Sequence, residues 1–418
     1  MICDHIPYIQ KYSKCITYTI QCNNRYTLLC YSKGGVYMPK ALVLAGGGAR
    51  GSYHIGAWQA LTELGYRFDI VTGTSVGSLN GTLVALDQFD VAKSMWLSID
   101  DHDVMDIPQK VLSKETVEFI KDFALKGGIS LEPLEKMIVR FVSEDAVRAS
   151  KCRYGLVTVN FDTKTPLELT IDEIPQGKLV DYMLASSAFA PFLRARTIDG
   201  EKYIDGGFHD NLPRRLAARM GADEIVEVTL DSLGFEKPLG QEHSHIKTTR
   251  IGSRHDLGNI LDFDPQTARR NIDLGYIDTY KAFDRLDGER YAFRKGELDS
   301  MYTAFGQKFM EKCHEVFTHH PTVMLAAQVY NRTEGGNPKT QQQKFVAALE
   351  AAMTAADLYV GEIYTLDNLP QLIREAPPTR YAGFFDKLTD DVTLKKLISK
   401  ISEKEIKNIY LSLLKSVL

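Results

Sequence analysis

The most constraining feature of this sequence is a pattern of strand, glycine-rich turn and helix that occurs twice in close succession. Residues 40–45 (KALVLA) form an apolar run that leads into GGGARG at 46–51, and residues 52–64 carry apolar side chains at helical spacing. The run 68–73 (FDIVTG), followed by 76–86 (VGSLNGTLVAL), repeats the pattern. Short apolar runs that end in glycine are typical of buried parallel strands. Their alternation with helices predicts a βαβ core.

The remaining chain extends this core and then becomes helical. We expect variable helices over 88–145, paired strands at 154–161 and 167–171, a helix at 178–188, a strand at 201–204, a helix at 212–220 and a strand at 224–230. From about residue 264 the pattern is mostly helical, and 344–360 is apolar enough for a buried helix. The sequence predicts a three-layer α/β/α core with a mostly parallel central sheet, followed by a helical C-terminal region.

The first 37 residues differ from the rest in composition. They hold four of the six cysteines, Cys3, Cys15, Cys22 and Cys30, and six of the 20 tyrosines. We interpret 1–37 as an N-terminal extension of open order, with Met38 as a natural start. An edge strand or hairpin is the alternative, because ITYTI and YTLLCY have strand composition. The domain prediction is therefore an extension over 1–37, a catalytic domain over 38–295 and a mainly helical region over 296–418.

Composition excludes several classes of protein. Apolar residues make up 44% and charged residues 25% of the 418, which is typical of a globular chain. The net charge of −4 gives no reason to expect nucleic acid as a partner. We expect no transmembrane helix, since no apolar run approaches about 18 residues, and no secretory signal. The expected location is cytoplasmic, with peripheral membrane contact as an extension of that prediction.

The first glycine loop has two interpretations. Gly46, Gly47 and Gly48 followed by Gly51 can bring backbone N–H groups close to an anion. The same letters satisfy the dinucleotide fingerprint, which also expects an acidic residue about 20 positions later. Asp69 stands in that range but precedes its strand. Dinucleotide binding remains the alternative from a different class of function.

The second motif, Gly73-Thr74-Ser75-Val76-Gly77, is a G-x-S-x-G sequence between a predicted strand and a predicted helix. That context is typical of a serine nucleophile on a sharp turn, although glycine–serine turns also occur without a function. A serine nucleophile needs a base and an oxyanion hole, and the 46–51 loop can supply the hole. The base is either Asp205, followed by Gly206 and Gly207, or a late histidine. The histidine candidates are His209, His243, His245, His255, His314, His319 and His320.

Three motifs together resemble the patatin-like phospholipase family, which carries a GGGxRG loop, a GxSxG elbow and a DG[AG] motif in that order. They stand here as GGGARG (46–51), GTSVG (73–77) and DGG (205–207), with ASSAFAP (185–191) and DNLPRRLAARMGADEIVEV (210–228) as further similar segments. The resemblance is strong over about 40–230 and extends more weakly to 260–283. Residues 1–37 and 300–418 carry little of it.

The resemblance implies a lipid acyl hydrolase of the phospholipase A, lysophospholipase or acylglycerol esterase type. It implies Ser75 as nucleophile, Asp205 as base without histidine, and an acyl-enzyme on Ser75 that water releases. The oxyanion residues would be Gly46, Gly47, Gly48, Arg50 and Gly51, with motif support from Gly73, Gly77, Gly206 and Gly207. Acyl transfer to an alcohol through the same intermediate is the alternative within the enzyme class, and a regulatory lipid-binding protein is a third possibility.

No cofactor is expected, and no clustered ligand set predicts a metal. The expected partner is a lipid acyl ester, while the oligomeric state and the head group stay open. The sequence LKKLISKISEKEIKNIYLSLLKSVL, which ends the chain, is a basic amphipathic segment that could lie on an anionic membrane. A helix packed on its own domain is the competing interpretation.

Overall fold

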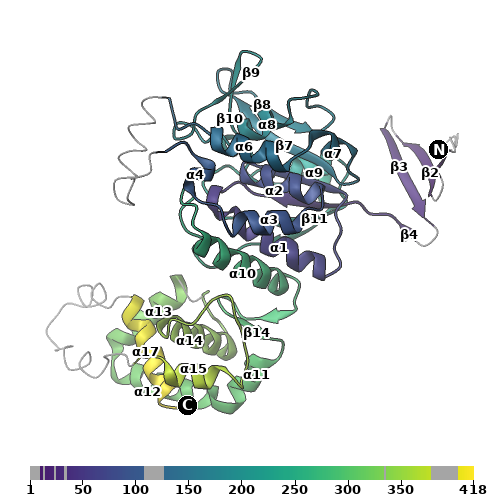
Figure 1. Ribbon diagram of the computed structural model, residues 1–418. Helices are drawn as coiled ribbons and strands as arrows, with labels where there is room; N and C mark the ends of the chain where they lie inside the picture. The colour runs from purple at the N-terminus through teal and green to yellow at the C-terminus, as the bar shows by residue number, and fades with distance from the viewer. Residues whose placement is uncertain are drawn as a thin grey trace. The chain divides into compact units, whose positions relative to one another are not determined.

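The structure, a computed structural model, describes residues 10–12, 15–22, 25–32, 35–107, 127–333, 336–377 and 403–418. This part of the chain divides into two compact units (Figure 1). The first comprises Met1–Gly48, Tyr66–Val91 and His102–Arg250, and the second comprises Ala49–Gly65, Ala92–Asp101 and Ile251–Leu418. The predicted boundary after residue 295 stays a prediction.

An eight-stranded sheet forms the centre of the first unit, in the order β12-β11-β5-β6-β7-β10-β9, with β8 paired to β7. Strands β11, β5, β6 and β7 are parallel, whereas β8, β9 and β10 make antiparallel pairs. The strands are β5 (Lys40–Leu44), β6 (Ile70–Thr74), β7 (Arg153–Asn160), β8 (Pro166–Thr170), β9 (Arg196–Ile198), β10 (Glu201–Asp205), β11 (Glu224–Val228) and β12 (Lys247–Ile251). The predicted mostly parallel sheet is confirmed.

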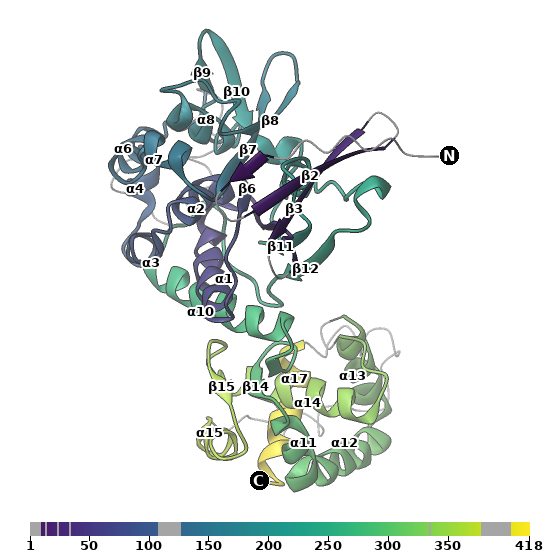
Figure 2. The ribbon, with the colours of Figure 1, turned by 90° about the vertical axis from the view of Figure 1, so that its right-hand side faces the viewer.

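Helices lie on both faces of this sheet. Tyr154 and Gly155 are neighbours on β7, so their side-chain positions point to opposite faces. The Tyr154 hydroxyl donates to the Ser78 carbonyl in α2 (Val76–Ala85) at 3.0 Å, whereas a Cβ at Gly155 would meet Leu216 of α9 (Arg214–Arg219) at 3.0 Å. Helix α8 (Leu179–Ser186) contacts α2 and the strands β7, β9 and β10 (Figure 2). The three-layer prediction is therefore confirmed.

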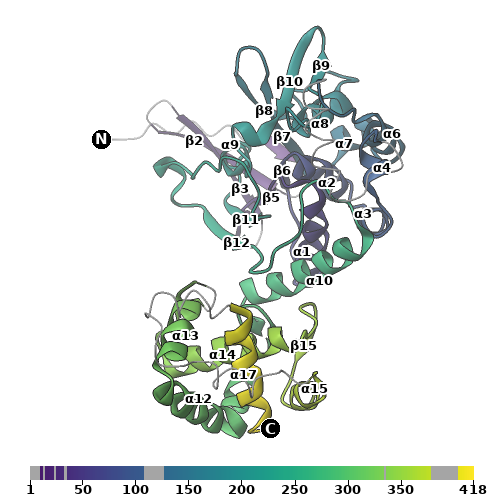
Figure 3. The ribbon, with the colours of Figure 1, turned by 90° about the vertical axis from the view of Figure 1, so that its left-hand side faces the viewer.

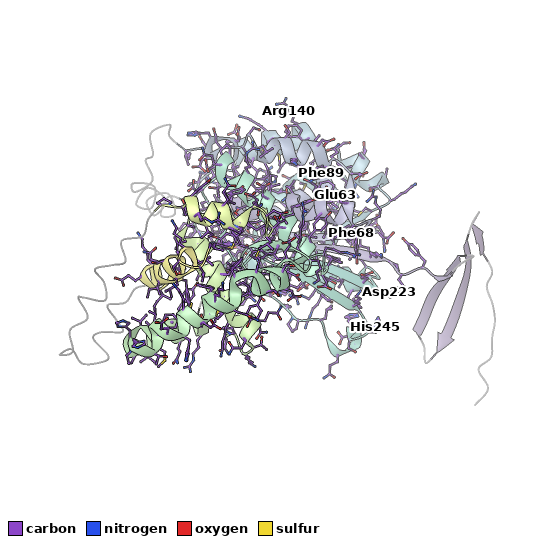
Figure 4. All side chains as sticks on the ribbon, turned by 90° about the horizontal axis from the view of Figure 1, so that it is seen from below. Glu63, Phe68, Phe89, Arg140, Asp223 and His245 are labelled. Atoms are coloured by element: carbon purple, nitrogen blue, oxygen red, sulfur yellow. The ribbon has the colours of Figure 1, made fainter. Side chains whose placement is uncertain are left out.

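Shorter elements complete the first unit. They are α6 (Glu132–Phe141), α7 (Glu144–Ala149), η2 (Gly206–Phe208), η3 (Gln241–His243), and the antiparallel strands β1 (Gln10–Tyr12), β2 (Cys15–Cys22), β3 (Arg25–Ser32) and β4 (Gly35–Val36). Strands β2 and β3 pair in antiparallel fashion, so the structure has the hairpin that was the alternative for ITYTI (16–20) and YTLLCY (26–31). Three elements span a boundary between units: η1 (Gly48–Gly51), α3 (Phe89–Trp96) and α4 (Asp101–Val104). The exposed side chains of Arg140 on α6 and His245 before β12 are labelled in Figure 4.

The second unit is mainly helical (Figure 3). It has its own apolar core. Its elements are α1 (Ser52–Glu63), α10 (Pro265–Ala282), β13 (Leu286–Asp287), β14 (Ala292–Arg294), α11 (Glu297–Met301), η4 (Tyr302–Gly306), α12 (Gln307–His319), α13 (Pro321–Thr333), α14 (Gln341–Ala355), β15 (Ile363–Tyr364), α15 (Leu369–Glu375) and α17 (Glu403–Lys415). A capping box starts α14, in which the Thr340 hydroxyl accepts the Gln343 N–H at 3.1 Å. The predicted buried helix at 344–360 is confirmed as far as Ala355, where α14 ends, and residues 356–360 are not helical.

The amphipathic C-terminal segment is partly described. Ile406, Ile409, Tyr410, Leu411 and Leu414 of α17 are buried in the core of the second unit. This favours packing on its own domain for that part of the segment. Residues 394–402 lie outside the described residues, so membrane contact through them stays a prediction. Among the described residues, every helix is too short or too polar to cross a membrane.

Candidate active site

The carboxyl ends of β5 and β6 and the end of β10 meet in one row across the sheet. Leu44, which ends β5, pairs with Gly73 on β6, and Thr74, which ends β6, pairs with Val157 on β7. Asp205, which ends β10, pairs with Thr158, the next residue of β7. This register brings the three glycine motifs to the same edge, which is where ligands bind in open α/β sheets.

Ser75 stands on a strained turn between β6 and α2. Its backbone has φ 54° and ψ −128°, a conformation that costs energy for any residue other than glycine. Gly77 permits the turn to pack tightly, because a Cβ there would lie 2.2 Å from the Leu44 carbonyl oxygen. The side chain of Ser75 is nearly buried, with 9% of the residue exposed. The geometry is that of a nucleophile elbow.

Asp205 lies beside Ser75, and the Ser75 hydroxyl acts to lower the pKa of the Asp205 carboxyl. The Asp205 carboxylate accepts the Gly207 N–H at 2.7 Å, within the turn that Gly206 and Gly207 form at the start of η2. Asp205 is 4% exposed. Burial raises the pKa of its carboxyl to about 6, although the hydrogen bond from Gly207 and the Ser75 hydroxyl act in the opposite direction. A carboxylate with this pKa is a stronger base than an exposed aspartate.

Backbone donors are available beside Ser75. A Cβ at Gly46 would lie 2.3 Å from the Asn211 Oδ1 and 3.1 Å from the Ser75 Cβ, so glycine allows this close approach. The N–H of Gly46 is already used, because it donates to the Asn211 carbonyl oxygen at 3.1 Å. The N–H groups of Gly47 and Gly48 have no hydrogen-bond partner within the described part of the chain. Gly48 begins η1, and the first N–H groups of a helix lack intrahelical acceptors.

Arg50 and Gly51 belong to the second unit, where Gly51 ends η1. The Nε of Arg50 donates to the Gly258 carbonyl oxygen at 2.7 Å, and its Nη2 lies 3.8 Å from the Asp256 carboxylate. These contacts hold the guanidinium against the 256–258 loop. The predicted role of Arg50 and Gly51 at the oxyanion stays a prediction.

The histidines of the first unit make other contacts. His209 follows η2, and its ring lies 3.3 Å from Glu168 and 3.0 Å from the Nζ of Lys237. Burial and the neighbouring Lys237 lower the pKa of His209. Within the described part of this unit, His209, His243 and His245 make no hydrogen bond with Ser75 or Asp205. The contacts of the first unit therefore favour the carboxylate over a histidine as the partner of Ser75.

Three side chains that no sequence motif indicated hold these loops in place. The Ser186 Oγ accepts the Ser75 N–H at 2.9 Å and donates to the Val157 carbonyl at 2.7 Å. Asn211 donates through Nδ2 to the Gly46 carbonyl at 3.2 Å and to the Ser232 Oγ at 3.0 Å. Ser232 also donates to the Gly46 carbonyl. Ser186 and Asn211 lie in two segments that resemble the family, 185–191 and 210–228. This resemblance was the one feature of the sequence that could have indicated a role for them at the site.

The dinucleotide alternative finds no support in this arrangement. Asp69 precedes β6, and its carboxylate accepts the N–H of Lys40, the first residue of β5, at 2.9 Å. Because β5 and β6 are parallel, Asp69 lies at the opposite edge of the sheet from the glycine loop. A dinucleotide bound at Gly46–Gly48 therefore could not place its ribose beside Asp69.

A family model matches the part of the chain that holds the three motifs. Residues 42–218 match the family model described as patatin-like phospholipase. Residues 42–218 are therefore the part of this chain that is similar to the patatin-like phospholipase family. The matched segment contains the glycine loop, the elbow and the Asp205 turn, so the family resemblance predicted from the three motifs is confirmed.

Curated relatives match over part of their length. Lysophospholipase nte1 of Aspergillus fumigatus is 26% identical over 299 residues, which are 65% of this chain and 18% of that protein. The human patatin-like phospholipase domain-containing protein 6 is 31% identical over 203 residues, 46% of this chain and 13% of that protein. This chain therefore spans less than a fifth of the length of either relative.

Solved structures show a weaker likeness. The crystal structure of VipD from Legionella pneumophila aligns over 98% of this chain and 96% of its own, with 13% identity and a TM-score of 0.35. The type III effector ExoU aligns over 94% of this chain and 80% of its own, with 14% identity and a TM-score of 0.33. At these scores the likeness carries no argument, and the fold rests on the strand order and helix layers described above.

Proposed function

We propose that this chain is a lipid acyl hydrolase that cleaves carboxylic esters through an acyl-enzyme on Ser75. The observation that carries the proposal is the placement of Ser75, on its strained turn, and the buried carboxylate of Asp205 at the same edge of the sheet. Burial raises the pKa of that carboxyl, and the Ser75 hydroxyl acts to lower it. Lipid esters are the proposed substrates because the family model is that of a phospholipase. Lysophospholipids are the first class to test, because curated relatives are named lysophospholipases.

In the first half of the reaction, Ser75 Oγ attacks the ester carbonyl carbon and its proton passes to Asp205. The resulting oxyanion accepts hydrogen bonds from the N–H groups of Gly47 and Gly48. Collapse of the tetrahedral intermediate breaks the bond to the alcohol oxygen, which takes the proton from Asp205. Preorganised donors of this kind contribute about 10²–10³ in rate for each donor.

In the second half, water gives its proton to Asp205 and attacks the acyl carbon of the Ser75 ester. The proton returns to Ser75 as the carboxylic acid leaves, so the dyad is regenerated. The pKa of about 6 allows Asp205 to be ionised at neutral pH while remaining a better proton acceptor than an exposed aspartate. An alcohol in place of water would make the same intermediate a transferase.

The decisive experiment is labelling with a fluorophosphonate followed by intact-mass measurement. We expect one adduct on the wild type and none on Ser75→Ala. Lysophosphatidylcholine and a diacylglycerol then test the substrate class, with glycerol added to detect transfer. A folded wild type that gains no adduct would contradict the proposal, and NAD or FAD binding would be measured next.

A further inference from the structure

Four large apolar side chains stand exposed on the segments that surround the Asp205 turn. Phe161, Phe208, Leu233 and Phe235 are 37%, 43%, 77% and 67% exposed. We call these four residues the apolar rim. Apolar side chains that are scattered singly on a surface need no explanation, whereas a group beside a reaction centre marks a contact surface.

Backbone contacts tie the rim to the candidate site. Phe208 ends η2, three residues after Asp205. The Phe235 N–H donates to the Gly207 carbonyl at 3.0 Å, and the Phe235 carbonyl accepts the Asn211 N–H at 2.6 Å. Leu233 and Phe235 are therefore held beside the turn that carries the base, rather than on a remote loop.

A groove of about 420 Å³ is lined by two members of the rim. Phe161 and Phe208 line it together with Pro191 and Lys164. Phe208 stacks on Phe189, with ring centroids 5.9 Å apart, so this wall of the groove is continued by a second aromatic ring. The lining is mostly apolar, which suits contact with hydrocarbon rather than with a polar solute.

Two lysines beside the rim lack acidic partners. The Lys164 Nζ lies 4.1 Å from the centroid of the Phe161 ring, and the Lys237 Nζ contacts the His209 ring. Neither lysine pairs with a carboxylate anywhere in the described residues. Nearby Glu236 pairs with Arg214, whereas Glu168 faces His209, whose pKa is lowered. Lys164 and Lys237 are therefore the two basic side chains beside the rim that can meet an anionic group of a ligand.

We propose that the apolar rim docks on the surface of a phospholipid bilayer that contains anionic lipid, with Lys164 and Lys237 meeting lipid phosphates. This inference rests on the proposed function, because a nearly buried Ser75 must receive an ester that a membrane presents. Aromatic and leucine side chains enter the interface between head groups and acyl chains, and neighbouring lysines add attraction to anionic lipid. The docked surface lies beside Asp205, so an extracted lipid has a short path to the nucleophile.

The test measures vesicle binding by flotation in a Ser75→Ala background, where hydrolysis cannot alter the membrane. Vesicles contain phosphatidylcholine with or without phosphatidylglycerol. The paired variant Leu233→Ser/Phe235→Ser is expected to raise the dissociation constant by about tenfold or more. The matched control is Val139→Ser, because Val139 is 63% exposed but belongs to α6. Equal binding by the paired variant and the control would overturn the proposal.

A second pair of substitutions tests the charges. Lys164→Gln and Lys237→Gln are each expected to reduce binding to phosphatidylglycerol vesicles by about fivefold and to leave binding to phosphatidylcholine unchanged. An undiminished preference for anionic vesicles in both would overturn the role of the lysines. Thermal unfolding shows whether each variant is folded, and Leu233→Ser alone serves if the paired variant is not.

Separate outcomes identify failure of the inference and failure of the proposed function. Absence of fluorophosphonate labelling on wild-type Ser75 would contradict the function whatever the vesicle result. Normal labelling with vesicle binding insensitive to the rim would contradict the inference alone. A wild type that self-associates in sedimentation, with a monomeric paired variant that still binds vesicles, would make the rim a contact between copies of this chain and would also overturn the inference.

Discussion

The turn around Ser75 and the core around Phe345 are both buried, but different forces hold them. At the turn, directional hydrogen bonds join Ser75 to Ser186 and Asp205 to Gly207, and glycines allow backbones to touch. In the second unit, Phe345 is fully buried, with its ring centroid 5.3 Å from that of Tyr302 and 6.0 Å from that of Phe305. The first region fixes the position of individual atoms, whereas the second supplies apolar burial. Substitutions should therefore separate activity from stability.

The largest expected effect is that of Asp205→Asn. The amide keeps the shape of the side chain but cannot accept the proton of Ser75, so kcat/KM for an ester should fall by about 10³ or more. Thermal unfolding should change little, because an amide is cheaper to bury than a charge. Steady-state kinetics and calorimetry on the same sample make the measurement. An Asp205→Asn enzyme that retains most of its activity would contradict the dyad.

Phe345→Ala tests the other side of the comparison. Removing a fully buried aromatic ring from a packed core costs about 3–5 kcal/mol, since a cavity remains. Urea unfolding of the second unit should detect this loss, while fluorophosphonate labelling of Ser75 at low temperature should persist. The control is Val329→Ala, because Val329 on α13 is 44% exposed and its loss should leave stability nearly unchanged. Equal losses of stability in Phe345→Ala and Val329→Ala would contradict the contribution of Phe345 to the stability of the second unit.

Asn211→Ala should give an intermediate effect on chemistry. Asn211 bridges the carbonyl of Gly46 and the hydroxyl of Ser232, so its loss releases the glycine loop. A misplaced donor loop should lower kcat by about 10–100-fold and change KM less. Asn368→Ala removes an asparagine that holds a local turn in the second unit and should leave kcat unchanged. If KM carries the whole effect of Asn211→Ala, a role in positioning the oxyanion donors is excluded.

The smallest effect on activity is expected from Asp210→Asn. Asp210 is fully buried, and desolvation raises the pKa of its carboxyl to about 6, as it does for Asp205. Its Oδ1 accepts N–H groups of Leu212 and Lys237, an acceptor that asparagine keeps. The activity should fall about tenfold per pH unit below about 6, because protonated Asp205 cannot act as a base. The Asp210→Asn enzyme should keep this acidic limb of the pH–activity profile. Loss of the acidic limb in this variant would assign the titration to Asp210.

Strong local signals made much of the first unit predictable. The apolar runs of β5 and β6 and the small residues of α2 specify buried strands and a close helix, and the three motifs identified the edge where they meet. Strand β12 was missed, since KTTRI has four polar residues and lies at an edge of the sheet. The three-residue strand β9 is too short to show a period.

The supporting side chains of the site were missed for a different reason. Ser186 lies 111 residues from Ser75, and Asn211 lies 165 residues from Gly46. A single polar residue has no periodicity, and only the folded sheet brings it to its partner. In the second unit, helices could be predicted from apolar spacing, but the small sheet of β13, β14 and β15 has strands of two or three residues and left no pattern.

The close approach of Gly46 to Ser75 has a consequence for how such an enzyme can diversify. A turn that must be glycine has no side chain with which to distinguish one ester from another. Discrimination among substrates must then come from side chains at neighbouring positions that tolerate exchange. The residues of the reaction and the residues of selectivity therefore lie in separate segments. New specificities can evolve in the neighbouring positions while the glycine turn stays constant.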